Sequence, residues 1–305
     1  MINKYTYKGG VWVRLDRPTK EEIGAIMDEY GIDPLTAREL TTPTPRPKVQ
    51  LHKDYIYCIL HFPAFKHTHK EGDTNQEVDF IVGKDFVITT QYDTIDAFLH
   101  LSKIMEVDEI LNKGNYDSAA GFVFFRIVKE LYSSLFEEIA YIEDWIEEIE
   151  GRIFKGKERE MVIALSQVSR NLLDFKKVTN LHKDVIHSLE VVGNRLFGEH
   201  FSFHVHAILG EYYKIHNTIR GTMESAQELR DTNNSLLETK QNEVMKVLTI
   251  LAYLTLPSSL IAAIYSMNTS FVPLVGIPND FWLVIAIMFT ISMSLFAIFK
   301  RKGWL

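Results

Sequence analysis

Cysteine is nearly absent from this chain, which has a single one, Cys58, among 305 residues. One cysteine cannot form an intrachain disulfide. It also lies within an apolar run, where a thiol behaves as a small hydrophobic side chain. We therefore predict that Cys58 is a buried core residue and not a catalytic thiol.

Sequence motifs of enzymes and of nucleic-acid-binding proteins are also missing. The chain has no glycine-rich phosphate loop and no Ser/His/Asp signature, so we predict that it is not an enzyme and holds no covalently bound cofactor. Its formal net charge of -7 argues against a nucleic acid as a partner. The first ten residues contain no apolar run, which predicts no secretory signal peptide and a cytoplasmic N-terminal part.

Charged residues are missing from two long stretches near the C-terminus. Residues 247–266 and 281–299 contain no Asp, Glu, Lys, Arg or His, and each is close to the roughly 20 residues that a membrane-spanning helix needs. We predict two transmembrane helices there, joined by a short external loop, 266–280. Lys246 and the run Lys300 to Lys302 flank the spans, so the positive-inside rule places both termini in the cytoplasm, at the inner membrane.

The residues before the spans divide into two parts. Residues 1–117 switch between strand and helix periods, which predicts an α+β cytosolic domain. Strands are expected at 11–15, 55–62, 78–82 and 86–90, with a hairpin at 83–85, and helices at 18–30 and 33–40. Residues 118–245 are expected to form long stalk helices, and residues 246–305 the two-helix transmembrane unit.

The stalk is expected to contain three helices. The first ends near Gly151, and the second runs from 157 to 192. The third begins after Gly198 and meets no strong helix breaker before Pro257, so it continues into the first span. A helix of about 60 residues is roughly 90 Å long, far more than one membrane crossing requires.

One stripe of residues recurs along this third helix at alternating spacings of three and four. Such spacing places all its members on one helix face. The members in and next to the span are Asn242, Met245, Thr249, Ala252, Leu256, Ser259 and Ala263. Towards the N-terminus the same spacing continues through Glu238, Ser235 and Asp231. An acidic seam is a poor coiled-coil core but suits a water-filled channel. The alternative is a solvated acidic stripe above an ordinary helix-packing face.

The segments that carry a family resemblance are concentrated in the last 65 residues. They are Asn242 to Thr249, Leu256-Pro257, Tyr265-Ser266-Met267-Asn268 and Lys300 to Leu305, with a weaker likeness at Arg46-Pro47-Lys48 and Asp54-Tyr55. Together they resemble the CorA-type magnesium transporter family. The resemblance implies a homopentameric funnel in the membrane lipid, with the first membrane helix lining a pore for divalent cations.

The resemblance also implies roles for individual residues. Tyr265, Ser266, Met267 and Asn268 match the outer mouth, where the family has Tyr-Gly-Met-Asn and the asparagine receives a hydrated cation. Asn242 would form a second polar ring, Met245 and Leu256 an apolar gate, and Asp231 with Glu238 a cytosolic acidic ring. Transport would be driven by the electrochemical gradient.

Two departures from the family pattern leave the identity of the ion open. Ser266 replaces the signature glycine, and Ser270 and Leu274 stand where the family has acids in the external loop. We expect Mg²⁺ as the transported or regulatory cation, with Co²⁺, Ni²⁺ or Zn²⁺, as in a ZntB-like zinc transporter, as alternatives. A non-conducting membrane sensor that kept the scaffold is the rival hypothesis.

Three histidines lie close together in the sequence, at His200, His204 and His206. Histidine suits transition metals better than Mg²⁺, so these residues are candidates for a regulatory metal site. The alternative is that they are solvated or core histidines.

Overall fold

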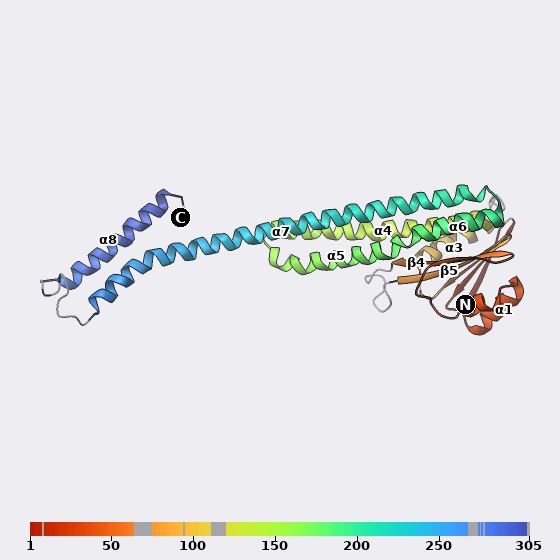
Figure 1. Ribbon diagram of the computed structural model, residues 1–305, viewed down its shortest axis with the longest axis horizontal. Helices are drawn as coiled ribbons and strands as arrows, with labels where there is room; N and C mark the ends of the chain where they lie inside the picture. Colours follow the sequence, from red (N-terminus) through yellow and green to blue (C-terminus); the bar gives the residue numbers. More distant parts are fainter. Residues whose placement is uncertain are drawn as a thin grey trace. The chain divides into compact units, whose positions relative to one another are not determined.

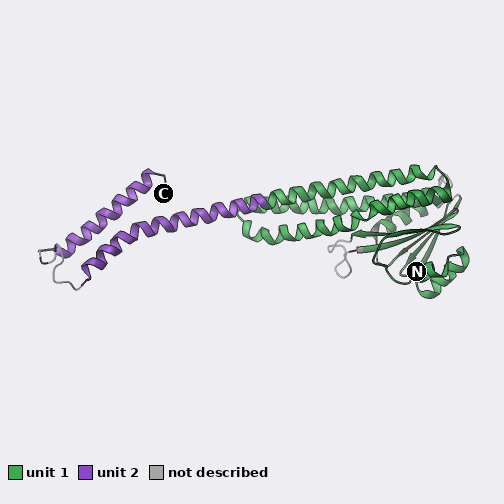
Figure 2. Cartoon of the chain, in the orientation of Figure 1, with its two compact units in different colours: residues 1–230 green, residues 231–305 purple. Residues whose placement is uncertain are grey.

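The computed structural model describes residues 1–7, 9–63, 75–93, 95–110, 120–267, 274, 276 and 278–303. It consists of two compact units, residues 1–230 and residues 231–305 (Figure 2). The division between the units falls within one continuous helix. The domain boundaries expected at 117/118 and 245/246 remain predictions.

Unit 1 is built on a six-stranded mixed sheet. Its strands are β1 (Ile2–Tyr7), β2 (Gly10–Asp16), β3 (Lys48–Leu51), β4 (Tyr55–Pro63), β5 (Asn75–Gly83) and β6 (Phe86–Gln91). They lie in the order β1-β2-β6-β5-β4-β3. The β2–β6 pair is parallel and the other pairs are antiparallel. The predicted hairpin at 83–85 is confirmed, because it connects the paired strands β5 and β6.

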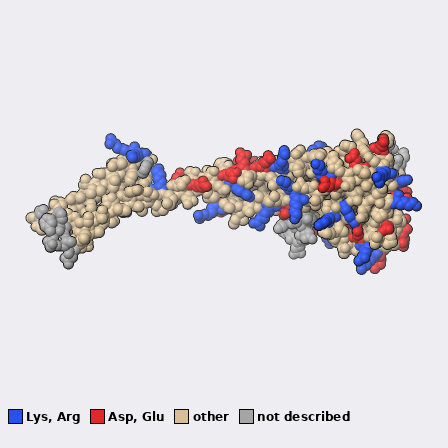
Figure 3. Space-filling model, viewed as in Figure 1, with Lys and Arg blue, Asp and Glu red and all other residues tan. Residues whose placement is uncertain are grey.

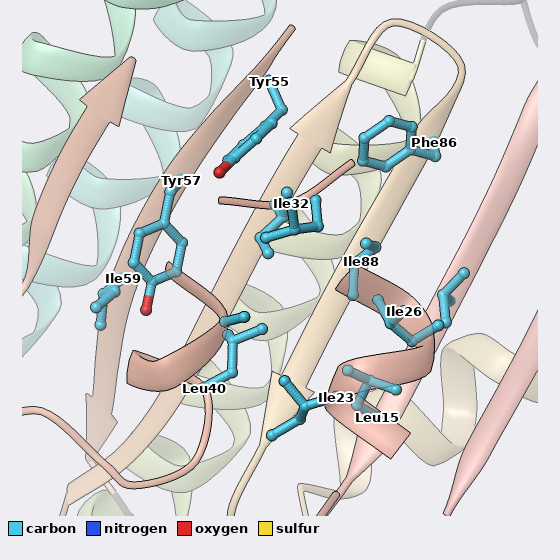
Figure 4. Packing of buried hydrophobic residues seen from close by; sticks show 13 residues of the cluster. Leu15, Ile23, Ile26, Ile32, Leu40, Tyr55, Tyr57, Ile59, Phe86 and Ile88 are labelled. Carbon is cyan, nitrogen blue, oxygen red and sulfur yellow. The ribbon is translucent and has the colours of Figure 1, made fainter. Parts of the chain in front are cut away.

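Two short helices, α1 (Lys20–Tyr30) and α2 (Pro34–Glu39), cover one face of the sheet (Figure 1). A capping box starts α1: the Thr19 side chain accepts from the Glu22 amide, and the Glu22 carboxylate accepts from the Thr19 amide. Gly31 ends α1 with a φ of 65°, a conformation that favours glycine. Figure 4 shows the apolar core between these helices and the sheet, which includes Leu15, Ile23, Ile26, Ile32, Leu40, Tyr55, Tyr57, Ile59, Phe86 and Ile88.

Longer helices cover the opposite face of the sheet. They are α3 (Asp96–Ile110), α4 (Ala120–Phe154), α5 (Glu158–Asn180) and α6 (His182–Phe197). All nine residues of β4 are buried, as expected for a strand covered on both faces. Cys58 of β4 is fully buried, which confirms its predicted place in the core.

The single stalk helix predicted from 157 to 192 is wrong, because the structure divides this segment into α5 and α6 at Leu181. There the Leu181 amide donates to the Val178 carbonyl, three residues back, instead of continuing the α-helical pattern. The next side chain, His182, is fully buried and holds the start of α6 in place. Its Nε2 donates to the His61 carbonyl of β4 at 2.6 Å, and its Nδ1 accepts from the Tyr132 hydroxyl of α4 at 2.7 Å.

The predicted third stalk helix is confirmed as α7 (Phe201–Tyr265), which continues through Pro257. The last helix is α8 (Asp280–Arg301). Three elements were not expected from the sequence: β1, β3 and α3. β3 has only four residues, and β1 alternates polar and aromatic residues near its end. Neither edge strand therefore contains the apolar run that would predict a strand.

Candidate pore-lining face of α7

Within unit 2, α8 packs against one face of α7. The Ser258 and Ser292 hydroxyls lie 2.9 Å apart, and the rings of Tyr253 and Phe299 have centroids 6.2 Å apart. Ile250 is buried, with 5% of its surface exposed. Together with the partly buried Leu254, these residues define the face of α7 that α8 covers.

The predicted stripe lies on the opposite face of α7. A shift of two residues turns an α-helix by about 200°, so Leu256 points away from Leu254 and Ala252 points away from Ile250. All seven stripe residues in and next to the span are exposed in the single chain: Asn242, Met245, Thr249, Ala252, Leu256, Ser259 and Ala263. The stripe is therefore free of α8 and available to water, lipid or another subunit.

The hydroxyl groups on the stripe are turned towards their own helix. Thr249 Oγ1 donates to the Met245 carbonyl at 2.7 Å, and Ser259 Oγ donates to the Thr255 carbonyl at 2.8 Å. A hydroxyl that donates its proton in this way keeps its oxygen lone pairs as acceptors. The stripe can thus offer neutral oxygen atoms to a cation or to the water around it.

The acidic positions of the stripe have the same relation to the buried side of α7. Asp231, Ser235 and Glu238 are exposed, whereas Asn233, two residues from both Asp231 and Ser235, is buried with 1% of its surface exposed. Carboxylates at Asp231 and Glu238 thus face away from the packed side, where they can attract cations.

The predicted outer mouth lies where α7 ends. Tyr265 is the last helical residue, and the amides of Ser266 and Met267 donate to the carbonyls of Ala262 and Ile264 at 3.0 and 3.2 Å. Asn268 and Ser270 lie outside the described residues. Asp280, the acid at the end of the loop, accepts from the Gly276 amide at 3.2 Å and from the Phe281 amide at 2.7 Å, at the start of α8.

The distribution of charge in unit 2 fits two membrane spans. Figure 3 shows a long surface of uncharged residues, with basic side chains beside one end of it. Both α7 and α8 contain a segment long and apolar enough to cross a membrane, and almost no residue in these segments is buried. Apolar side chains exposed on all sides of a segment this long are expected where the surroundings are nonpolar, as in a bilayer.

The histidine cluster does not form a metal site within one chain. His204 packs against the rings of Phe122, Phe125 and Phe203, and burial lowers the pKa of its side chain. The Nδ1 of His206 is bonded to the Ser202 carbonyl, 2.7 Å away. Among the described residues, no three His, Cys, Asp or Glu side chains are placed to hold a metal ion.

The contact between Ser258 and Ser292 was not anticipated from the sequence. Both serines lie within apolar spans, where a hydroxyl needs a hydrogen-bond partner. A serine in an apolar span therefore predicts a hydrogen bond. It does not identify the partner, because several hydroxyls in these spans bond to carbonyls of their own helix.

Known proteins resemble this chain over nearly its whole length. A family model described as "CorA-like Mg2+ transporter protein" matches residues 7–301. The chain is 25% identical over 299 residues to the cobalt/magnesium transport protein CorA of Methanocaldococcus jannaschii, a match that covers 97% of this chain and 91% of that protein. It is also 25% identical over 296 residues to the cobalt/magnesium transport protein CorA of Thermotoga maritima, covering 96% and 83% of the two chains.

The fold agrees with these sequence matches. The complete structure of the CorA magnesium transporter from Methanocaldococcus jannaschii matches with a TM-score of 0.84 at 24% identity, covering 97% of this chain and 92% of that chain. The predicted fold class, an α+β domain with long helices and a C-terminal helix pair, is confirmed. This chain therefore belongs to the CorA-like Mg²⁺ transporter family.

Proposed function

We propose that this protein is a divalent cation transporter in the cytoplasmic membrane, with Mg²⁺ as its main substrate. The observation that carries the proposal is the exposed, uncharged stripe of α7 on the side opposite α8. Relatives at 25% identity are named as cobalt/magnesium transport proteins, which makes Co²⁺ the second substrate to test. At 100 mV a divalent cation gains about 4.6 kcal/mol on entering the cell, so the membrane potential is a sufficient driving force.

We propose that the transporter is a homopentamer with both termini in the cytoplasm and the α7 stripe around a central pore. Asn268 forms the outer polar ring and Asn242 the inner one, with Met245 and Leu256 as apolar constrictions between them. Asp231 and Glu238 concentrate cations at the cytoplasmic side. The exposure of Asn242, Met245, Leu256, Asp231 and Glu238 on one face of α7 supports this arrangement.

Neutral oxygen atoms at the mouth suit a hydrated Mg²⁺ ion. Mg²⁺ releases its water reluctantly, so a ring of amide oxygens can hold it through its hydration shell. Asp280 is bonded to two backbone amides, and it is the one acid between residues 266 and 280. Selection at the mouth then depends mainly on hydrogen bonding from Asn268 and only weakly on attraction by charge.

Replacing Asn268 by alanine is expected to lower Mg²⁺ flux at least about tenfold, because the outer ring loses its amide oxygens. The measurement is uptake of Mg²⁺, Co²⁺, Ni²⁺ and Zn²⁺ into proteoliposomes containing the full chain, with a fluorescent indicator inside. Asn217→Ala is the matched control: this exposed asparagine also lies on α7, but in unit 1, before the membrane span begins.

The outcomes of this experiment separate the hypotheses. Preference for Zn²⁺ over Mg²⁺ would replace the proposed substrate with that of the zinc-transporter alternative. Absence of flux for every ion, from protein shown to be folded and oligomeric, would favour a non-conducting membrane sensor. Equal flux in the native chain and in Asn268→Ala would remove Asn268 from the pathway.

Cysteine labelling is expected to show which face of α7 is in contact with water. Thr249→Cys and Ser259→Cys should react with a membrane-impermeant maleimide at least about tenfold faster than Leu251→Cys, because thiol reactions require an ionised and hydrated thiol. Leu251 is a suitable control since it is 58% exposed in the single chain but lies about 200° around the helix from Thr249. Cys58 is buried and adds little background. Equal labelling at all three positions would contradict a water-filled stripe.

A further inference from the structure

The helix α7 has a weak point within its membrane span. Pro257 has no amide proton, so the carbonyl of Tyr253 loses its usual partner in the helix, and the proline ring disturbs the preceding turn. An unsatisfied backbone group is costly in a bilayer, and such sites are tolerated where neighbouring helices support them. In this chain, the neighbouring helix α8 contacts α7 beside Pro257.

Ser292 of α8 contacts α7 on both sides of this proline. Its hydroxyl donates to the Leu254 carbonyl at 3.4 Å, three residues before Pro257. The same oxygen lies 2.9 Å from the hydroxyl of Ser258, directly after Pro257. A serine has one hydroxyl proton, so Ser258 must donate to Ser292 whenever Ser292 donates to the Leu254 carbonyl.

This pair of bonds lies behind the proposed gate. Leu254 and Ser258 each lie two residues from Leu256, so they project from the opposite side of the helix. Prolines inside helices cause kinks, so we expect the direction of α7 to be set locally at Pro257. A change in this bend would move Leu256, because Leu256 lies in the same helical turn.

We propose that Ser292 is a positioning residue for transport: through its bonds to Leu254 and Ser258, it fixes the α7 bend at Pro257 and holds Leu256 in the pore. This inference rests on the proposed function, since Leu256 has a role in transport only if the stripe lines a pore. Without the Ser292 hydroxyl, the bend is loosened and the apolar constriction closes less tightly.

The test measures divalent uptake into proteoliposomes by the full chain and by Ser292→Ala. We expect Mg²⁺ flux to rise by about threefold or more, the ratio that corresponds to an average interhelical hydrogen bond in a membrane protein. Ser292→Thr keeps a hydroxyl and should restore the native flux. Ser294→Ala is the matched control, because the Ser294 hydroxyl donates to the Thr290 carbonyl of its own helix at 2.7 Å.

A second readout needs no flux. Thr249→Cys places a thiol between Met245 and Leu256, so its labelling from outside by a membrane-impermeant maleimide reports passage beyond Leu256. Added to this reporter, Ser292→Ala should raise the labelling rate by about threefold, and Ser294→Ala should not. The thiol signal is specific, because the native Cys58 is buried.

Ser258→Ala provides an independent variant if Ser292→Ala does not fold. It removes the shared hydrogen bond from the other side, so it should raise flux and labelling in the same direction. The double variant should change both no more than the stronger single variant, as expected for two residues that act through one contact.

The inference is overturned if Ser292→Ala and Ser258→Ala match Ser294→Ala in both flux and labelling. It is also overturned if Ser292→Thr behaves like Ser292→Ala, because the effect would then come from packing and not from the hydroxyl. Absence of flux from the native chain would contradict the proposed function alone, since labelling of the Thr249→Cys reporter would still show whether Ser292 controls the constriction.

Discussion

Replacing His182 by alanine is expected to destabilise the packing of α6 on the sheet by about 3–5 kcal/mol, from two unpaired buried polar groups and the volume of the lost ring. His182 is fully buried. Its ring joins three elements that are far apart in the sequence: α6, the β4 backbone at His61 and α4 at Tyr132. Without it, the His61 carbonyl and the Tyr132 hydroxyl lose their partners in a region that excludes water.

The hydrogen bonds define the protonation state of His182. A carbonyl oxygen can only accept, so Nε2 of His182 carries the proton and donates to His61. A neutral ring then leaves Nδ1 as the acceptor for the Tyr132 hydroxyl. Burial disfavours the charged ring and lowers the pKa of His182 from 6.5 to about 4. His182 is therefore neutral at physiological pH.

This lowered pKa gives stability a pH dependence of known sign. The folded chain binds a proton at His182 less readily than the unfolded chain, so the stabilisation is present above pH 6.5 and is lost as the pH falls towards 4. The loss attributable to His182 is about 3 kcal/mol over this range. In His182→Gln, which keeps a donor for the His61 carbonyl but does not titrate, this part of the pH dependence should disappear.

Hydrogen exchange of the full chain in detergent measures both effects. We expect peptides from α6 to exchange faster in His182→Ala than in the native chain, with His182→Gln in between at pH 7. His187→Ala is the control, since it removes an exposed histidine from the same helix. Native protection of α6 in His182→Ala, or the same loss of protection with falling pH in His182→Gln as in the native chain, would contradict the role assigned to His182.

The break between α5 and α6 illustrates what the sequence could not predict about the fold. Residues 178–184 contain no glycine or proline, so a helical period could be followed through them without interruption. At the break, His182 is hydrogen-bonded to residue 61, which is 121 positions away, so the interaction found there is not local in the sequence. By contrast, the β5–β6 hairpin was predictable, because the apolar strands are separated by Gly83-Lys84-Asp85 and all of the signal is local.

The candidate site shows the same division between local and tertiary information. The stripe from Asn242 to Ala263 could be found from its spacing alone, because residues on one helix face recur at three and four positions. The face of α7 that α8 covers could not be predicted from the sequence, because the span is apolar on nearly every face. Hydropathy does not distinguish a face that contacts lipid from a face that contacts another helix. The position of α8 is revealed by the contact between Ser258 and Ser292, two serines whose sequence context predicts a hydrogen-bond partner but does not identify it.

Replacing Leu256 by serine is expected to raise divalent flux at least about tenfold, if Leu256 forms the apolar constriction. A ring of leucine side chains excludes water and leaves a cation without its hydration shell or ligands. Serine is smaller and offers a hydroxyl oxygen, so water can remain in the constriction. A tenfold rise corresponds to a barrier lower by about 1.4 kcal/mol, a small part of the cost of dehydrating Mg²⁺.

Leu251→Ser is the matched control for this experiment. Leu251 and Leu256 are similarly exposed in the single chain, at 58% and 63%, but they lie on different faces of α7. If the stripe lines the pore, Leu251→Ser places a hydroxyl at the lipid or at a subunit contact and should not raise flux. A rise of equal size in both variants would indicate a general loosening of the membrane unit and would contradict a gate at Leu256.

Substituting Met245 as well as Leu256 tests whether one constriction or two limit the flux. Met245 lies about three turns from Leu256, towards the cytoplasmic end of the same stripe, and is also exposed, at 54%. If the two residues form barriers in series, the higher barrier limits the rate of ion flux. Leu256→Ser alone then has its full effect only when the barrier at Leu256 is higher than the barrier at Met245. Combining Leu256→Ser with Met245→Ser removes both barriers, so the double variant must conduct at least as fast as either single variant. Native flux in the double variant would show that neither residue restricts the pathway, and the gate would then have to lie at the polar rings.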